Sequence, residues 1–397
     1  VPMLVALPPR FAERFATAFV EVLHALRDAE ALEGVGAVGV RQPETERALK
    51  MLLVLPALLL RRTPRSDPRR MGAALAQRFT LWETRAYAEL VAGWERDCAV
   101  HATRRWPARE DAADRALRRA LALIAKGKIS DASRLLDSHG IADIARPEVL
   151  AQMVAKHPVR VESVDAVLDG VDDAPHLRVL PADIETAFRH LDTDKAAGAS
   201  AWRYEYLTAL VPTVPFPSLV AADAAAAGAY FATRFANGAL PAWFNFVFSS
   251  VRLLALRKRA PSADEAEDAR PVGISCALRR AVTKAIFANA SLKETFAGHL
   301  APQQLGVAVA AGATKLIIGL RELLDAELSF GIFTLDISNA FNSVSRAAVL
   351  RQLSDGSVPG EIRALARLAH ATLGPQAPVF AGGGSGGAPL TQLPFRS

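Results

Sequence analysis

Residues 330–353, FGIFTLDISNAFNSVSRAAVLRQL, constrain the fold of this chain more than any other segment. An apolar run from Phe330 to Ile337 is followed by residues whose apolar positions recur at helical spacing. We expect a short buried strand and then an amphipathic helix, with Asp336 at the end of the strand. A carboxylate there faces a cleft, where it could hold a divalent cation. The alternative is that Asp336 only caps the helix and that Phe341 belongs to the core.

The order of residues in LDISNAFNSVSR resembles motif A of reverse transcriptases, especially those of non-LTR retrotransposons and group II introns. The resemblance implies that Asp336 is catalytic and binds Mg²⁺, with the backbone carbonyl of Ile337 as a further metal ligand. It also implies that Phe341 is the steric gate beneath the sugar of the incoming dNTP, with Ala340 beside it. In that family two metal ions activate the primer 3′-hydroxyl and stabilise the departing pyrophosphate.

Residues 244–275 show a similar resemblance to the family's motifs 1 and 2. We expect a β-rich segment from Phe244 to Arg257, an acidic hairpin tip over residues 260–269, and a second strand beginning at ARPVGIS. Lys258 and Arg270 match the family's basic residues, and Arg270 is implied to contact the incoming triphosphate. The planar guanidinium of an arginine suits that role because it can bind two phosphate oxygens while staying charged.

A helix is expected directly after Ser275, with Arg279, Arg280 and Lys284 on the side opposite its apolar residues. The family has basic residues on this helix that approach the template, which implies that role for Arg280 and Lys284. The alternative is an ordinary solvated face.

Two further phrases match the family in the same order along the chain. Residues 183–210 contain Lys195, Gly198 and Trp202 in a helix–turn–helix arrangement, and residues 301–323 contain Gln304 before a long helix. The resemblance implies template or primer contacts for Lys195 and Gln304. The alternative for the first phrase is an unrelated helix–turn–helix with Trp202 in the core.

The resemblance fails towards the end of the chain. In residues 382–395 the glycines, Pro389 and Leu390 align with the family's motif B, but Ala388 replaces its aspartate. This glycine run could equally be a flexible tail. The Tyr/Phe-x-Asp-Asp of motif C does not occur in the sequence. Since two-metal catalysis needs at least one more carboxylate near Asp336, we expect this chain alone to be inactive.

Composition excludes several other classes. The 397 residues carry a formal charge of +6, which suits a polyanionic partner without requiring one. Two cysteines, Cys98 and Cys276, exclude a disulfide framework and a cysteine-based zinc finger. The longest apolar run, residues 51–60, is too short to span a bilayer, so we expect no membrane partner. The chain begins with Val1, and we expect it to be a piece of a longer reading frame.

These patterns predict an α+β chain. Residues 1–180 form a helical N-terminal region, in which helices are expected over 80–100, 111–124 and 129–136, the last two joined at Gly127. Residues 181–397 form reverse-transcriptase fingers and a truncated palm. The implied function is RNA-directed DNA polymerisation with Mg²⁺ in the complete protein, on an RNA template and a DNA primer. The alternative is an inactive nucleic-acid-binding or interaction module that retains the fold. The element type implies a nuclear location.

Overall fold

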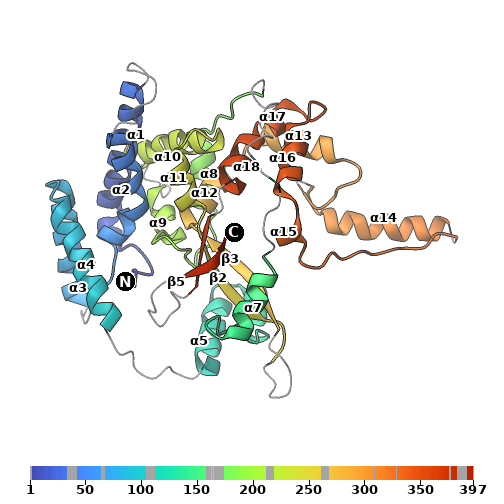
Figure 1. The fold of residues 1–397 in the computed structure, drawn as a ribbon, viewed down its shortest axis with the longest axis horizontal. Coiled ribbons are helices and arrows are strands. Elements are labelled where there is room, and N and C mark those ends of the chain that lie inside the picture. The colour runs from blue at the N-terminus through green and yellow to red at the C-terminus, as the bar shows by residue number, and fades with distance from the viewer. Residues whose placement is uncertain are drawn as a thin grey trace.

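The computed structural model describes residues 2–33, 43–63, 68–103, 112–157, 162, 164, 174–211, 219–260, 268–307, 309–327, 329–374, 377–381 and 391–396. The fold is α+β, as the sequence predicts, with many helices around one small mixed sheet. Figure 1 shows the sheet near the centre, between the N-terminal helices and a C-terminal group of helices.

Four long helices begin the chain: α1 (Ala12–Glu33), α2 (Pro43–Leu59), α3 (Pro68–Glu83) and α4 (Tyr87–Thr103). The apolar stripe of α1 is fully buried, because Phe15, Phe19 and Leu23 pack against α2 and α10. The pattern expected as one helix over residues 80–100 is interrupted at Arg85, whose backbone is left-handed (φ 59°), so α3 and α4 are separate. Among the described residues, no helix is both long enough and apolar enough to cross a membrane.

Three helices follow: α5 (Ala112–Ala125), α6 (Ile129–Leu136) and α7 (Pro147–Ala155). The predicted break at Gly127 is correct, since its φ of 72° suits a residue without a side chain. α5 and α6 therefore form a helical hairpin, with α6 at its predicted bounds and α5 one residue later than expected. Val149 and Met153 of α7 are buried against the sheet.

The main core crosses residue 180, where the composition of the sequence changes. It joins α1 and α2 to four later helices, namely α8 (Pro181–Arg189), α9 (Tyr204–Leu207), α10 (Leu219–Ala236) and α12 (Ala277–Ile286). Trp202 is completely buried there, and its indole Nε1 donates to the carbonyl of Leu52 at 2.9 Å. The core interpretation of Trp202 is thus confirmed.

The β2–β3 hairpin is the backbone of the sheet. β2 (Val251–Arg257) and β3 (Ala269–Ser275) pair antiparallel along their whole length, from Val251 opposite Ser275 to Arg257 opposite Ala269. The other edge of β2 is shared by β1 (Ile141–Ala142) and the parallel strand β4 (Pro378–Ala381), and β5 (Thr391–Arg396) pairs with β4. The predicted strand–loop–strand unit is confirmed over these residues.

The expected β-structure over residues 244–250 is wrong, because α11 (Ala242–Phe248) occupies most of that segment. Phe244 and Phe248 lie one helical turn apart, with ring centroids at 5.0 Å, and both contact Phe231 of α10. Phe244 and Phe248 therefore share one buried face of a helix, and Phe246, two residues from each, is turned away and is 37% exposed.

The C-terminal part is helical apart from β4 and β5. It contains α13 (Ala290–Leu300), α14 (Gly312–Ala326), α15 (Ala340–Ser343), α16 (Arg346–Ser354), α17 (Gly360–Arg363) and α18 (Leu365–Leu373). α14 projects away from the body in Figure 1, and the chain then returns to α15. The motif B-like residues 382–390 lie outside the described residues.

Candidate nucleic-acid interface

The segment around Asp336 is extended but is not a buried strand. The side chains of Phe333, Leu335 and Ile337 are 87%, 76% and 65% exposed, and Asp336 is exposed as well. The sequence prediction of a buried strand is therefore wrong. A strand needs a hydrogen-bonded neighbour and a covered face, and no described strand pairs with residues 330–337.

α15 begins directly after this segment, at Ala340. Asn339 precedes the helix in a left-handed conformation (φ 55°), which an asparagine adopts more readily than most residues. Its side-chain Nδ2 donates to the backbone carbonyl of Lys156 at 3.0 Å. Phe341 lies in α15, but its side chain is outside the described residues. The segment with Asp336 and Ala340 is thus fixed at its end to the C-terminus of α7.

The same Lys156 contacts the base of the β2–β3 hairpin. Its ammonium group lies 3.1 Å from Asp268 Oδ1 and also donates to the carbonyl of Ala269, at the start of β3. Lys258 contacts the other carboxylate oxygen of Asp268 at 2.8 Å. The hydrogen bonds from Lys258 and Lys156 lower the pKa of Asp268 below its usual value.

Arg270 is exposed and follows the buried Ala269 on β3. Its side chain points to the opposite face of the strand from Ala269. Lys258, in contrast, is paired with Asp268. Through Lys156, the structure brings the end of the Asp336 segment and the base of this hairpin to one region.

Two other predicted residues lie over the ring of Tyr204, and a third is on the neighbouring loop. Arg280 lies over it, with Cζ 4.8 Å from the ring centroid, and Lys284 places Nζ at 5.9 Å. These cations are one helical turn apart on α12, so both reach the same ring. Arg280 also donates to the carbonyl of Ala196 at 2.8 Å, which ties α12 to the loop that carries the exposed Lys195. We call Lys195, Arg280 and Lys284 around Tyr204 the basic surface.

Arg279 does not belong to the basic surface. Its guanidinium turns inward and donates to the carbonyl of Ser249 at 3.1 Å. Burial lowers the pKa of this arginine. The prediction of one solvated side shared by Arg279, Arg280 and Lys284 is therefore wrong for Arg279, because consecutive helical residues differ by 100° in direction.

The loop before Tyr204 is held at several points. Gly198 lies against the end of β3, where an added Cβ would stand only 2.3 Å from the carbonyl oxygen of Ser275. Asp194 has a left-handed backbone (φ 75°), and its N–H donates to Glu205 Oε1 at 3.1 Å. Because these contacts fix the loop, Lys195 keeps its place beside α12.

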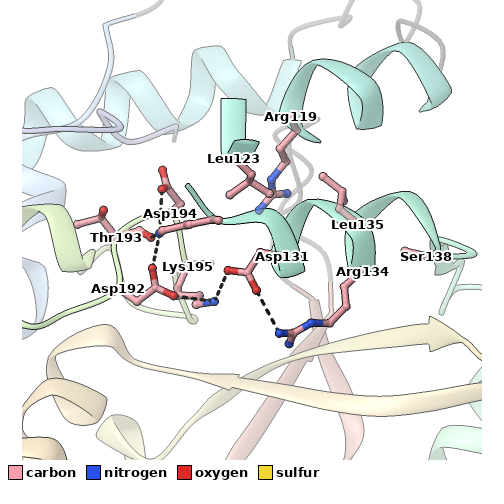
Figure 2. A pocket seen from close by; sticks show the side chains of 11 residues that line it. Arg119, Leu123, Asp131, Arg134, Leu135, Ser138, Asp192, Thr193, Asp194 and Lys195 are labelled. Atoms are coloured by element: carbon pink, nitrogen blue, oxygen red, sulfur yellow. Dashed lines mark hydrogen bonds and ion pairs between the residues drawn. The ribbon is translucent and has the colours of Figure 1, made fainter. Parts of the chain in front are cut away.

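A hollow of about 240 Å³ lies on the other side of Lys195, between this loop and the α5–α6 hairpin. Figure 2 shows Lys195 between Asp192 and Asp131, at 2.8 and 3.7 Å, and Arg134 beyond Asp131. Lys126 contacts Asp194 at 2.8 Å.

Lys128 completes the attachment of the hairpin by donating to Asp192 and Asp194. Hydrogen bonds from Lys128 and Lys195 lower the pKa of Asp192, and the bond to Asp192 raises the pKa of Lys128. We call these contacts of Lys126, Lys128 and Lys195 with the three aspartates the ionic clasp.

Sequence reasoning missed the ionic clasp. Its lysines and aspartates are spread over positions 126–195, and nothing in their spacing indicates that they meet. It also missed Tyr204 as the support of the cations, although the i, i+4 spacing of Arg280 and Lys284 could have indicated a shared partner.

Gln304 is not joined to the basic surface by any described contact. It is exposed in the turn after α13, where Oε1 accepts from the N–H of Gly306. Within the part of the chain that the structure describes, no group of three His, Cys, Asp or Glu side chains could hold a metal ion. The residues around Asp336 therefore do not fit a two-metal centre, which requires several oxygen ligands from neighbouring carboxylates.

Comparisons with protein-family models, with curated proteins and with solved structures find no match to this chain.

Proposed function

We propose that this chain binds nucleic acid through the basic surface, as the fingers and part of the palm of a reverse-transcriptase-type polymerase. The ligand would be an RNA template paired with a DNA primer. One observation carries the proposal. Of three cationic residues that the sequence resemblance assigns to the template or primer, Arg280 and Lys284 lie over Tyr204, and Arg280 donates to the loop that carries Lys195.

The geometry suits phosphate groups better than bases. Tyr204 is only 5% exposed, so its ring is not available to stack on a base and instead supports the two cations above it. A guanidinium held over an aromatic ring keeps its N–H edges directed outward, where they can donate to phosphate oxygens. Lys195 and Lys284 are both exposed and add two positive charges, of which that of Lys195 is shared with Asp192 and Asp131 of the ionic clasp. Binding of this kind depends strongly on salt and weakly on base sequence.

Polymerase activity belongs to the complete protein in this proposal. Asp336 stands in an exposed segment whose apolar neighbours face solvent. A catalytic carboxylate must be held rigidly relative to its partners, so we infer that this chain alone binds a primer–template without extending it.

The binding test uses fluorescence anisotropy with a labelled RNA–DNA primer–template and the full chain. The double variant Arg280→Ala/Lys284→Ala should bind about tenfold or more weakly, because two phosphate contacts are lost. The matched control is Lys293→Ala/Arg321→Ala. It removes two exposed charges from α13 and α14, which lie away from α9 and α12 in Figure 1. Equal weakening in both variants, or in neither, would overturn the assignment of the interface.

Primer extension tests the second part. No dNTP incorporation is expected from the chain alone in the presence of Mg²⁺. Incorporation that disappears in Asp336→Ala would show that the chain is an active polymerase and would refute the inference of binding without extension.

A further inference from the structure

The α5–α6 hairpin presents its largest apolar side chains to solvent. Leu117, Leu121 and Ile124 are spaced four and three residues apart on α5, and they are 52%, 56% and 49% exposed. On α6, Ile129 and Leu136 are seven residues apart and 69% and 54% exposed. Helical residues at these spacings share one side of a helix. Each helix therefore carries a continuous exposed apolar row.

The hairpin is attached to the body by the opposite, polar side. Arg119 and Leu123 of α5, and Asp131 of α6, line the hollow next to the ionic clasp (Figure 2). Each lies two residues from a member of the apolar rows, which is roughly 160° around a helix. The charged side thus faces the body and the apolar side faces away from it, the reverse of the usual arrangement in a surface helix.

The two rows lie on the same side of the hairpin. Ala120 of α5 and Ala132 of α6 are buried, and α5 packs against α6, so we infer that these two small residues mark the contact between the helices. The exposed rows are turned in the same rotational sense from this contact, as seen from the N-terminus of each helix. Because the helices run antiparallel, equal rotations bring the rows to one common face. We call Leu117, Leu121, Ile124, Ile129 and Leu136 the apolar face.

We propose that the apolar face binds the same face of a second copy of this chain. Two antiparallel hairpins joined in this way form a four-helix bundle, in which apolar rows from both layers make the core. A twofold axis makes the contact self-complementary, since every residue meets the same set on the other copy.

The area of the apolar face sets the strength expected of this contact. Each of the five half-exposed side chains would bury on the order of 80 Å² of apolar surface, so two copies bury on the order of 800 Å² before the flanking residues are counted. Specific, stable interfaces begin at about 1,000 Å² in total, and smaller ones are weak and transient. We therefore expect a weak, reversible dimer.

Sedimentation velocity of the full chain over a wide concentration range, after nuclease treatment, tests the proposal. The wild-type chain should show a concentration-dependent monomer–dimer equilibrium that persists in high salt, because the contact is apolar. Leu121→Glu/Ile129→Glu should weaken the dimer at least about tenfold, since each copy then places two charges in the interface. Circular dichroism would show whether this variant keeps its helix content, as expected for exposed positions.

The matched control is Leu316→Glu/Ile318→Glu on α14, where the side chains are 49% and 52% exposed. This variant should dimerise like the wild type. A wild-type chain that stays monomeric at all concentrations would overturn the proposal, and so would a dimer that survives Leu121→Glu/Ile129→Glu. Because the apolar face shares no residue with the basic surface, nucleic-acid affinity of the monomeric variant per copy distinguishes a failure here from a failure of the proposed function.

Discussion

The side-chain amide of Asn339 donates to the backbone carbonyl of Lys156, 183 residues earlier in the chain. The side chain of the same lysine contacts Asp268 and the carbonyl of Ala269 at the base of the β2–β3 hairpin. One residue therefore joins the helix after Asp336 to the hairpin that carries Lys258 and Arg270. In the sequence these two segments are separate phrases, and their proximity is a property of the fold.

This contact predicts a graded effect of two substitutions at Asn339. Asn339→Gly loses the hydrogen bond but tolerates the left-handed backbone, and should weaken the local structure by about 1 kcal/mol. Asn339→Ala loses the same hydrogen bond and, unlike glycine, places a side chain in the left-handed conformation. This costs about 1–2 kcal/mol more. Hydrogen exchange of the amides of α15 measures both. Equal effects of alanine and glycine would show that the backbone conformation is not important there.

Gly198 and Gly319 should respond oppositely to the same change. At Gly198 the added methyl group would collide with the Ser275 carbonyl at 2.3 Å, so Gly198→Ala should destabilise the chain by about 1–3 kcal/mol. Gly319 lies inside α14 with no atom within 4 Å of an added Cβ, so Gly319→Ala should stabilise that helix by up to about 1 kcal/mol. Denaturant unfolding followed by circular dichroism compares the two.

The salt dependence of binding should identify phosphate contacts. If Arg280 and Lys284 each neutralise one phosphate, the slope of log affinity against log salt concentration should become shallower by about 1 for each residue replaced by alanine. An unchanged slope together with weaker affinity would indicate that these residues stabilise the structure and do not contact phosphates.

If Lys195 contacts nucleic acid, Asp131 should compete with a phosphate group for its ammonium group. Asp131→Asn removes the contact at 3.7 Å but keeps the size of the side chain. The lysine then has one fewer carboxylate partner, and we expect about a threefold gain in affinity for the primer–template. Asp137→Asn, at an exposed position following α6, is the control with the same change in charge. An equal gain in both variants would mean that only net charge matters.

The ionic clasp should hold the hairpin over a defined range of pH. The pKa values of Asp192 and Asp194 are lowered by their lysine partners, so their stabilising contribution is present above about pH 4 and is lost as the pH falls through the lowered values. The pKa of Lys128 is raised, so its contribution is present below about pH 10 and is lost above it. The protection of the amides of α5 and α6, measured as the hydrogen-exchange rate relative to an unstructured peptide at the same pH, should fall at both limits, and in high salt between them.

The sequence alone determined most of the local structure. Apolar spacing predicted the α5–α6 hairpin, Gly127 predicted its turn, and the β2–β3 hairpin and α12 lie where their patterns place them. These features depend on residues close together in the chain, whose side chains and backbone preferences act over one or two turns. For the same reason the i, i+4 spacing of Arg280 and Lys284 predicts from the sequence that the two side chains are neighbours.

Only the tertiary structure decided what those elements meet. Phe330–Ile337 has the composition of a buried strand, yet it is exposed because burial needs a partner surface that the segment itself does not contain. The ionic clasp, the ring of Tyr204 beneath two cations, and the link from Asn339 to Lys156 join residues that are distant in sequence. Such contacts depend on how whole elements pack, and a periodic pattern along the chain carries no information about their distance in space.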